Sequence, residues 1–328
     1  MRVRVWGVLV GLGIAVALAA WMRMVSGDAA GLHWPESGTI LGLRAGRLGV
    51  GLVVGGSLAL CGTLVQSLVR NPLASPDLLG VSSGAGLGVA AAAYLGQRMQ
   101  SAAVPAWGAE WAAALTGALT TLGFILWCAR GRRTIEPTRL VLVGVIVGMI
   151  ASGGTLLIRH LMPASAEFEL SRWMLGAIRD DAPRGGLATG AGVLAASLVV
   201  SALAARGMDV ASLSDDEARA LGVRLRRLRL VLLLASGALA TSSVVLAGPV
   251  AFVGLLCPHA ARWLLGTARH GMVIPASAGL GAAAVVAADT ASACVPASIG
   301  RVPLGVVTAL VGGPVLLAML RGMVGRSS

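Results

Sequence analysis

Long apolar runs alternate with short polar connections along almost the whole chain. Runs long enough to cross a hydrocarbon layer of ~30 Å lie near residues 5–25, 48–69, 78–95, 107–129, 140–161, 186–205, 228–246 and 302–323. Two shorter runs, near 252–265 and 273–288, are ambiguous, so hydropathy alone predicts eight to ten membrane spans. The first run is longer than the ~7 to 15 residue apolar core of a signal peptide, and we expect a retained helix.

Composition supports a polytopic membrane protein. Of 328 residues, 56% are hydrophobic and 12% are charged, whereas about a quarter of the residues in soluble domains are charged. We therefore predict an all-α fold and a single transmembrane domain over 1–328. The net charge of +12 does not indicate a nucleic-acid partner, because the arginines sit in short connections, where the positive-inside rule places them. Their bias predicts that both termini are cytoplasmic.

The connection between the second and third apolar runs breaks the helical pattern. Pro72 and Pro76 each lack a backbone donor and disfavour a helical residue before them. A glycine and serine run follows at 80–86. Irregular backbone at membrane depth survives only against protein or a water-filled path. The segment therefore predicts a specialised position in the bundle.

A short polar helix is predicted between the runs near 186–205 and 228–246. Ser214 and Glu217 have the spacing of a capping box, and Asp215 and Asp216 place negative charge at the positive end of the helix dipole. Gly222 is a natural C-terminal stop. A helix of about two turns is marginal alone, so it must pack against a partner. Nearby arginines are expected to reach the lipid headgroups, and these are Arg224, Arg226, Arg227 and Arg229.

Other polar residues suggest alternative functions. Cys257-Pro258-His259 also occurs in heavy-metal pumps, but no phosphorylated-aspartate motif accompanies it, and we predict no metal site or cofactor. Asp289, near the end of the ninth span, motivates a proton-coupled secondary transporter. One acid without an evident intramembrane basic partner makes a poor proton relay, and we expect Asp289 instead to cap a helix or bond to a neighbouring helix. No phosphate-binding GxxxxGK[ST] loop is present, so we predict a transport subunit and not an enzyme.

Three segments carry a resemblance to a known family. RNPLASPDLLGVSSGAG from Arg70, GPVAFVGLLCPHAAR from Gly248 and RVPLGVVTALVGGP from Arg301 closely resemble the FecCD/BtuC family of bacterial ABC importer permeases. The resemblance extends over about residues 43–322. It implies a BtuC-like type II importer fold with ten transmembrane helices in the inner membrane. The implied cargo is a metal chelate, with a ferric siderophore expected first and haem or cobalamin as alternatives.

The resemblance also implies roles for particular residues. An EARALG-type element couples the permease to its ATPase, and here it comprises Ser214, Glu217, Ala218, Arg219, Leu221 and Gly222. A binding protein is expected to dock on Arg44 and Arg47, with Arg301 in place of a third arginine that is Ala293 here. Asn71, Leu73 and Thr138 are expected at the cytoplasmic mouth of the translocation path.

The partners follow from the same resemblance. We expect two ATP-binding cassette subunits inside, a second copy of this chain or a related permease, and a periplasmic or lipid-anchored substrate-binding protein outside. Membrane lipid surrounds the assembly. The choice between homodimer and heterodimer stays open at this stage.

Overall fold

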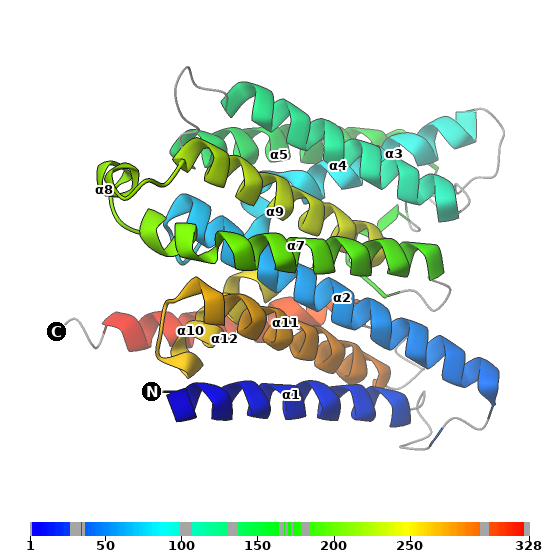
Figure 1. Cartoon of the computed structure of the whole chain (residues 1–328). Helices are drawn as coiled ribbons and strands as arrows, with labels where there is room; N and C mark the ends of the chain where they lie inside the picture. The colour runs from blue at the N-terminus through cyan, green and yellow to red at the C-terminus, as the bar shows by residue number, and fades with distance from the viewer. Residues whose placement is uncertain are drawn as a thin grey trace.

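The structure is a bundle of long helices that run along one common direction (Figure 1). This computed structural model describes residues 2–26, 34, 37–98, 107–129, 137–163, 167, 170–171, 173–178, 184–295 and 302–324. The helices are α1 (Arg2–Val25), α2 (Gly38–Val69), the 3-10 turn η1 (Pro76–Leu79), α3 (Val81–Arg98), α4 (Trp107–Ala129), α5 (Pro137–His160), α7 (Arg184–Ala211), α8 (Asp215–Ala220), α9 (Leu225–Ala247), α10 (Val253–Leu265), α11 (His270–Ala293) and α12 (Leu304–Val324).

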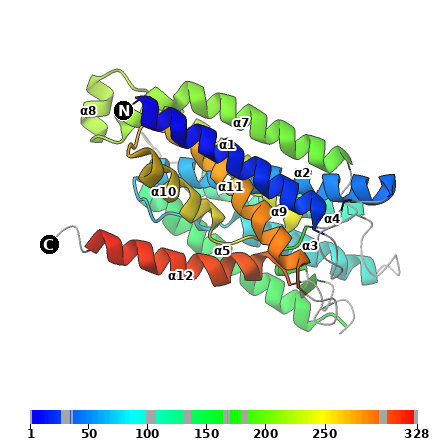
Figure 2. The same cartoon turned by 90° about the horizontal axis from the view of Figure 1, so that it is seen from below.

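The predicted all-α membrane fold is confirmed. Apart from the short α8, ten α-helices lie in the described ranges, which agrees with the ten spans implied by the resemblance. Six of them, α1, α2, α5, α7, α9 and α11, are long and apolar enough to cross a membrane by length and composition. Shorter apolar stretches lie in α4 and α12. Helix α1 begins, and α12 ends, at the end of the bundle where α8 lies (Figures 1 and 2). We call this the α8 end.

Helix α2 is the centre of the bundle. It has 32 residues and is buried almost continuously from Val50 to Gln66, with α7, α9, α10 and α11 packed around it. At 1.5 Å per residue its length is about 48 Å. It therefore exceeds the ~30 Å hydrocarbon layer.

Glycine sets how closely α2 approaches two neighbours. A Cβ on Gly55 would overlap the carbonyl oxygen of Gly281 in α11, and a Cβ on Gly62 would overlap the carbonyl oxygen of Gly254 in α10. Small residues at helical spacing allow such backbone contact in lipid. Gly55 belongs to the glycine-rich run 49–56, so this part of α2 packs closely against α11.

The ambiguous eighth span is a short helix, α10, and a break in the helical backbone precedes it. Helix α9 ends at Ala247, and α10 begins only at Val253 and has 13 residues, about 20 Å of helix. Between them, Gly248 (φ +69°) and Phe252 (φ +65°) turn the chain. The break is covered by protein, since the Ala177 N–H donates to the Ala247 carbonyl at 2.8 Å. Irregular backbone is therefore sheltered from lipid here.

Candidate coupling, gate and docking sites

Helix α8 is held by the predicted capping box. The Ser214 Oγ accepts from the Glu217 backbone N–H at 3.2 Å, and the Ser214 N–H donates to Glu217 Oε2 at 2.9 Å. The Ser214 hydroxyl also donates to Glu217 Oε2, at 2.7 Å, and this bond and the one from the Ser214 backbone N–H lower the pKa of the exposed Glu217 carboxyl. Gly222 ends the helix with φ +83°, as predicted. Ala218 is fully buried and seats the helix on the bundle.

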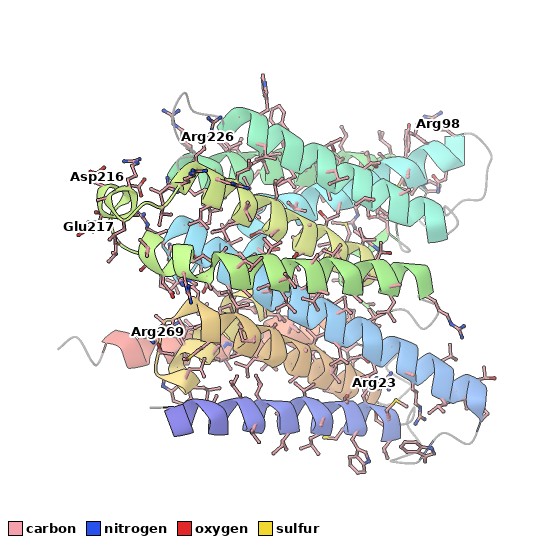
Figure 3. All side chains as sticks on the ribbon, viewed as in Figure 1. Arg23, Arg98, Asp216, Glu217, Arg226 and Arg269 are labelled. Carbon is pink, nitrogen blue, oxygen red and sulfur yellow. The ribbon has the colours of Figure 1, made fainter. Side chains whose placement is uncertain are left out.

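The remaining α8 side chains present polar groups to solvent. Leu221 is 64% exposed, and Arg219 is about half exposed and paired with Asp216 at 2.8 Å. Figure 3 shows Asp216 and Glu217 on α8, where it projects from the bundle. The predicted coupling residues are therefore brought together on one accessible helix.

Asp215 anchors α8 through two arginines from different helices. Arg70, at the end of α2, approaches Asp215 Oδ1 at 2.6 Å, and Arg229 of α9 approaches it at 2.7 Å. Partial burial acts to raise the pKa of Asp215, but hydrogen bonds and charge from Arg229 and Arg70 outweigh it, and the pKa lies below its usual range. The anchor thus contributes fully above the unfolded-state pKa near 3.9 and is lost as pH falls through the lower folded-state value.

The expectation that Arg229 reaches the headgroups is wrong. Its side chain is only 7% exposed and pairs with Asp215. The neighbouring Arg224, Arg226 and Arg227 are exposed. The four arginines look equivalent in the sequence, and only the packing of α9 shows that Arg229 is buried while the other three are exposed.

The segment after α2 is fixed by its own side chains and by α10. Arg70 caps α2 in the left-handed conformation, with φ +53°. Asn71 Oδ1 accepts from the Leu73 N–H at 2.9 Å. Gln66 Nε2 donates to the carbonyls of Ala74 and Leu255, both at 3.2 Å. We call residues 71–75 the gate loop.

Gln66 is itself oriented from α10. Its Oε1 accepts from Arg262 Nη2 at 2.5 Å. One buried amide therefore connects α2, the gate loop and α10. Sequence reasoning did not identify Gln66 or Arg262, although a glutamine inside an apolar span was a visible signal.

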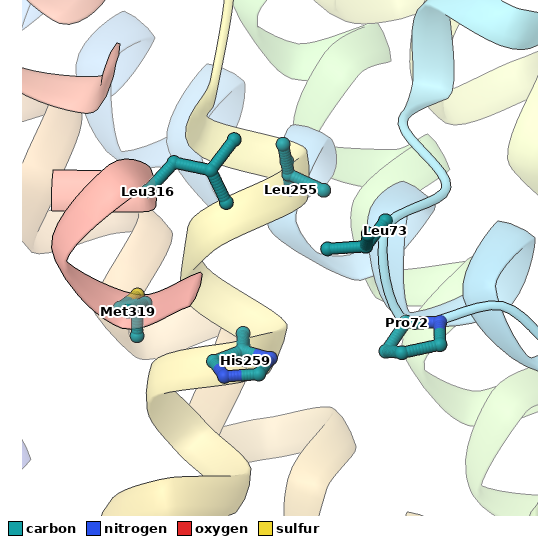
Figure 4. A pocket seen from close by; sticks show the side chains of 6 residues that line it. All are labelled: Pro72, Leu73, Leu255, His259, Leu316 and Met319. Carbon is teal, nitrogen blue, oxygen red and sulfur yellow. The ribbon is translucent and has the colours of Figure 1, made fainter. Parts of the chain in front are cut away.

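An apolar recess lies beside the gate loop at the α8 end. It is lined by Pro72, Leu73, Leu255, His259, Leu316 and Met319. Figure 4 shows the gate loop, α10 and α12 contributing to it. Leu73 thus lies where three elements meet, whereas Asn71 shapes the loop and does not line the recess. The side chain of Thr138, the third predicted mouth residue, lies outside the described residues.

Three buried charges meet at the opposite end of the bundle. Asp289 of α11 accepts from Arg23 of α1 at 2.6 Å and from Arg47 of α2 at 2.7 Å. All three side chains are at most 7% exposed. The expectation that Asp289 bonds to a neighbouring helix fits this arrangement, but the premise that it lacks a basic partner is wrong. The sequence did not indicate Arg23 as a partner of Asp289, because an arginine in the last turn of a first span looks like an ordinary flanking residue.

The predicted docking arginines differ from one another. Arg44 is partly buried and donates to the Met24 carbonyl at 2.7 Å, whereas Arg47 is buried and its guanidinium binds Asp289. Arg301 lies outside the described residues. Within the described ranges, no group of three or more His, Cys, Asp or Glu side chains is placed to hold a metal ion.

The fold and these sites define a polytopic transport permease. The model of the FecCD transport family matches residues 5–322, and the chain belongs to this family. The vitamin B12 import system permease protein BtuC of Salmonella arizonae is 35% identical over 325 residues, covering 95% of this chain and 93% of that protein. The BtuC protein of Citrobacter koseri is 35% identical over 321 residues, covering 94% and 92%. The chain is therefore an ABC importer permease of the metal-chelate or cobalamin type.

Solved structures show the same fold. A protein described as an ABC transporter of the metal-chelate type, in an inward-facing conformation, superposes with a TM-score of 0.84 at 23% identity, covering 97% of this chain and 99% of that one. PsaBC from Streptococcus pneumoniae in complex with Fab matches with a TM-score of 0.55 at 16% identity, covering 84% and 90%. At these identities the likeness concerns the fold alone.

The charge cluster at Asp289 yields a stability prediction. Asp289→Asn leaves two buried guanidinium groups without a countercharge, a loss of the order of 3 to 5 kcal/mol. Arg23→Met leaves the Arg47–Asp289 pair balanced, so it should lower the melting temperature in detergent less. Asp216→Asn is the control, because that side chain is 95% exposed. Equal melting temperatures for all three variants would contradict a structural role for the cluster.

Proposed function

We propose that this permease imports a corrinoid of the vitamin B12 type. The observation that carries the proposal is the identity of 35% over 95% of the chain to a protein named as a vitamin B12 import permease. The ferric siderophore expected from the sequence, and haem, stay as alternative cargoes.

The cargo is tested by uptake in cells that lack the gene. Deletion should abolish uptake of radiolabelled cyanocobalamin, and a plasmid copy should restore it, while uptake of ferric siderophores and haem should be unchanged. Loss of iron uptake alone would assign the siderophore instead. A protonophore at constant cellular ATP should leave cobalamin uptake intact, because the driving force is hydrolysis; collapse of uptake would favour proton coupling.

We propose that the α8 end faces the cytoplasm and that α8 inserts into a cleft of the ATPase subunit. Three features support it: the capped helix projects from the bundle (Figure 1), its exposed side chains include the charged Asp216, Glu217 and Arg219, and exposed arginines follow at the start of α9. ATP hydrolysis then belongs to the partner. We further propose two ATPase subunits and a second permease copy, a stoichiometry that native mass spectrometry of the purified importer would decide.

The docking surface of α8 is tested by charge reversal. Arg219→Glu replaces a half-exposed cation with an anion and should reduce copurification of the ATPase and uptake together. Arg226→Glu, an exposed arginine at the same end but on α9 (Figure 3), is the matched control and should have a smaller effect. If Arg219→Glu keeps full ATPase and normal uptake, the coupling element lies elsewhere.

We propose that a soluble binding protein docks at the opposite end, on a surface that includes Arg44. A planar guanidinium suits bidentate binding of a carboxylate from that partner. Arg47 is named in the same prediction, but its reversal would place a second carboxylate beside buried Asp289 and destabilise the fold. Arg301 also stays part of the prediction. Arg44 is therefore tested alone.

Arg44→Glu should weaken binding of the substrate-binding protein to the permease in nanodiscs. The loss should be larger at low salt than at high salt, because exposed charge attraction is screened. Arg98→Glu is the control, since Arg98 is exposed at the same end and bonds within α3 to Tyr94 at 3.0 Å. Unchanged affinity at low salt would remove Arg44 from the interface.

A further inference from the structure

Arg70 joins α8 to the segment that lines the recess. Its Nη2 donates to Asp215 Oδ1 of α8 at 2.6 Å, and its Nε donates to the Ala211 carbonyl at the end of α7 at 2.8 Å. Arg70 is the last residue before the gate loop, and its backbone is in the left-handed conformation. One side chain therefore contacts the predicted ATPase-docking helix while its own backbone starts the predicted gate.

The two arginines on Asp215 hold α8 to different parts of the bundle. Arg229 belongs to α9, a helix that α8 already joins through the short connection 221–224. Its side chain is 7% exposed, and it anchors α8 in place. Arg70 belongs to α2, which is distant from α8 in sequence. Asp215 also lies 3.7 Å from Arg219 of α8 itself. Of its pairs with other helices, the Arg70 pair is the one that reaches the gate loop.

The gate loop is constrained so that a shift at Arg70 is passed along it. Asn71 bonds to the Leu73 N–H, and Gln66 holds the Ala74 carbonyl. Leu73, between these two bonds, is 45% exposed and lines the recess opposite α12 (Figure 4). A displacement of the loop start would therefore change how Leu73 meets Leu316 across the recess.

We propose that the Asp215–Arg70 ion pair transmits movement of α8 to Leu73, which makes Arg70 a positioning residue for the gate. This inference rests on the proposed function, because it takes α8 as the ATPase contact and the recess as the gate. The proposed gate has two states. In one, Leu73 and Leu316 close the recess, and in the other these two side chains are apart. Loss of the pair uncouples the gate while leaving α8 anchored by Arg229.

The test combines transport, ATPase activity and gate geometry in the complete importer. Arg70→Met removes the pair and leaves Asp215 and Arg229 balanced. We expect ATPase copurification and hydrolysis close to wild type, while uptake falls by about two- to thirty-fold, the range for loss of one coupling contact. Arg70→Lys, which keeps the charge, should restore part of the uptake. Arg226→Met, which removes an exposed arginine at the same end but on α9, is the control.

Gate geometry is measured by crosslinking Leu73→Cys to Leu316→Cys after the exposed Cys128 and Cys294 are replaced by serine. With Arg70 present, crosslinking yield should differ several-fold between nucleotide-free and ATP-trapped importer. With Arg70→Met, the two yields should be equal. Wild-type uptake and nucleotide-dependent crosslinking in Arg70→Met would overturn the inference.

Two further outcomes separate this inference from the proposed function. If Arg70→Met loses hydrolysis and uptake together, Arg70 serves docking of the ATPase and not the gate, and the inference is wrong. If Arg219→Glu leaves the ATPase bound and active, the assignment of α8 itself fails. Loss of function in Arg219→Glu with normal behaviour in Arg70→Met would retain the proposed function and reject the relay.

Discussion

The contact between α2 and α11, at a distance that only glycine permits, is the constraint on which the rest of the structure depends. Gly55 and Gly281 place the two backbones against each other, so that α2 becomes a buried central helix. Both charge clusters are mounted on it, with Arg47 near its start and Arg70 at its end. Because a helix is stiff along its axis, α2 keeps these two clusters at a fixed separation.

The clusters around Asp289 and Asp215 have the same arrangement of charges, but they contribute differently to stability because their burial differs. In each, one carboxylate accepts from two arginines of separate helices. Around Asp289 all groups are buried, so removing the carboxylate leaves charge that water cannot solvate. Around Asp215 water reaches both the carboxylate and Arg70, and a single exposed pair contributes about 0 to 1 kcal/mol. The first cluster is suited to holding helices together permanently, and the second to a contact that can shift at little cost.

Local patterns predicted the local structure, and pairings across the chain were beyond them. The capping box of Ser214 and Glu217 is encoded within four residues, and the span pattern follows from hydropathy, so both were predictable. The Arg23–Asp289 bond joins residues 266 positions apart, and no periodicity within α1 indicates its partner. Arg229 likewise looked like its neighbours, because only the phase of α9 against α8 decides which arginine is buried.

Two segments of irregular backbone, the gate loop and the break at 248–252, lie near each other beside Gln66. The gate loop follows α2, and the break at 248–252 precedes α10, yet the buried Gln66 side chain binds the Ala74 and Leu255 carbonyls together. The loop carbonyl of Ala74 thus finds a partner inside the protein, as the membrane requires. The gate loop and the first turn of α10 then present a leucine each, Leu73 and Leu255, to the same recess. A pair of uninterrupted helices would have no such hinge, because their backbone bonds are fully used along their length. The breaks therefore place irregular backbone where the recess lies, and the glycine contacts of α2 hold α10 and α11 close beside it.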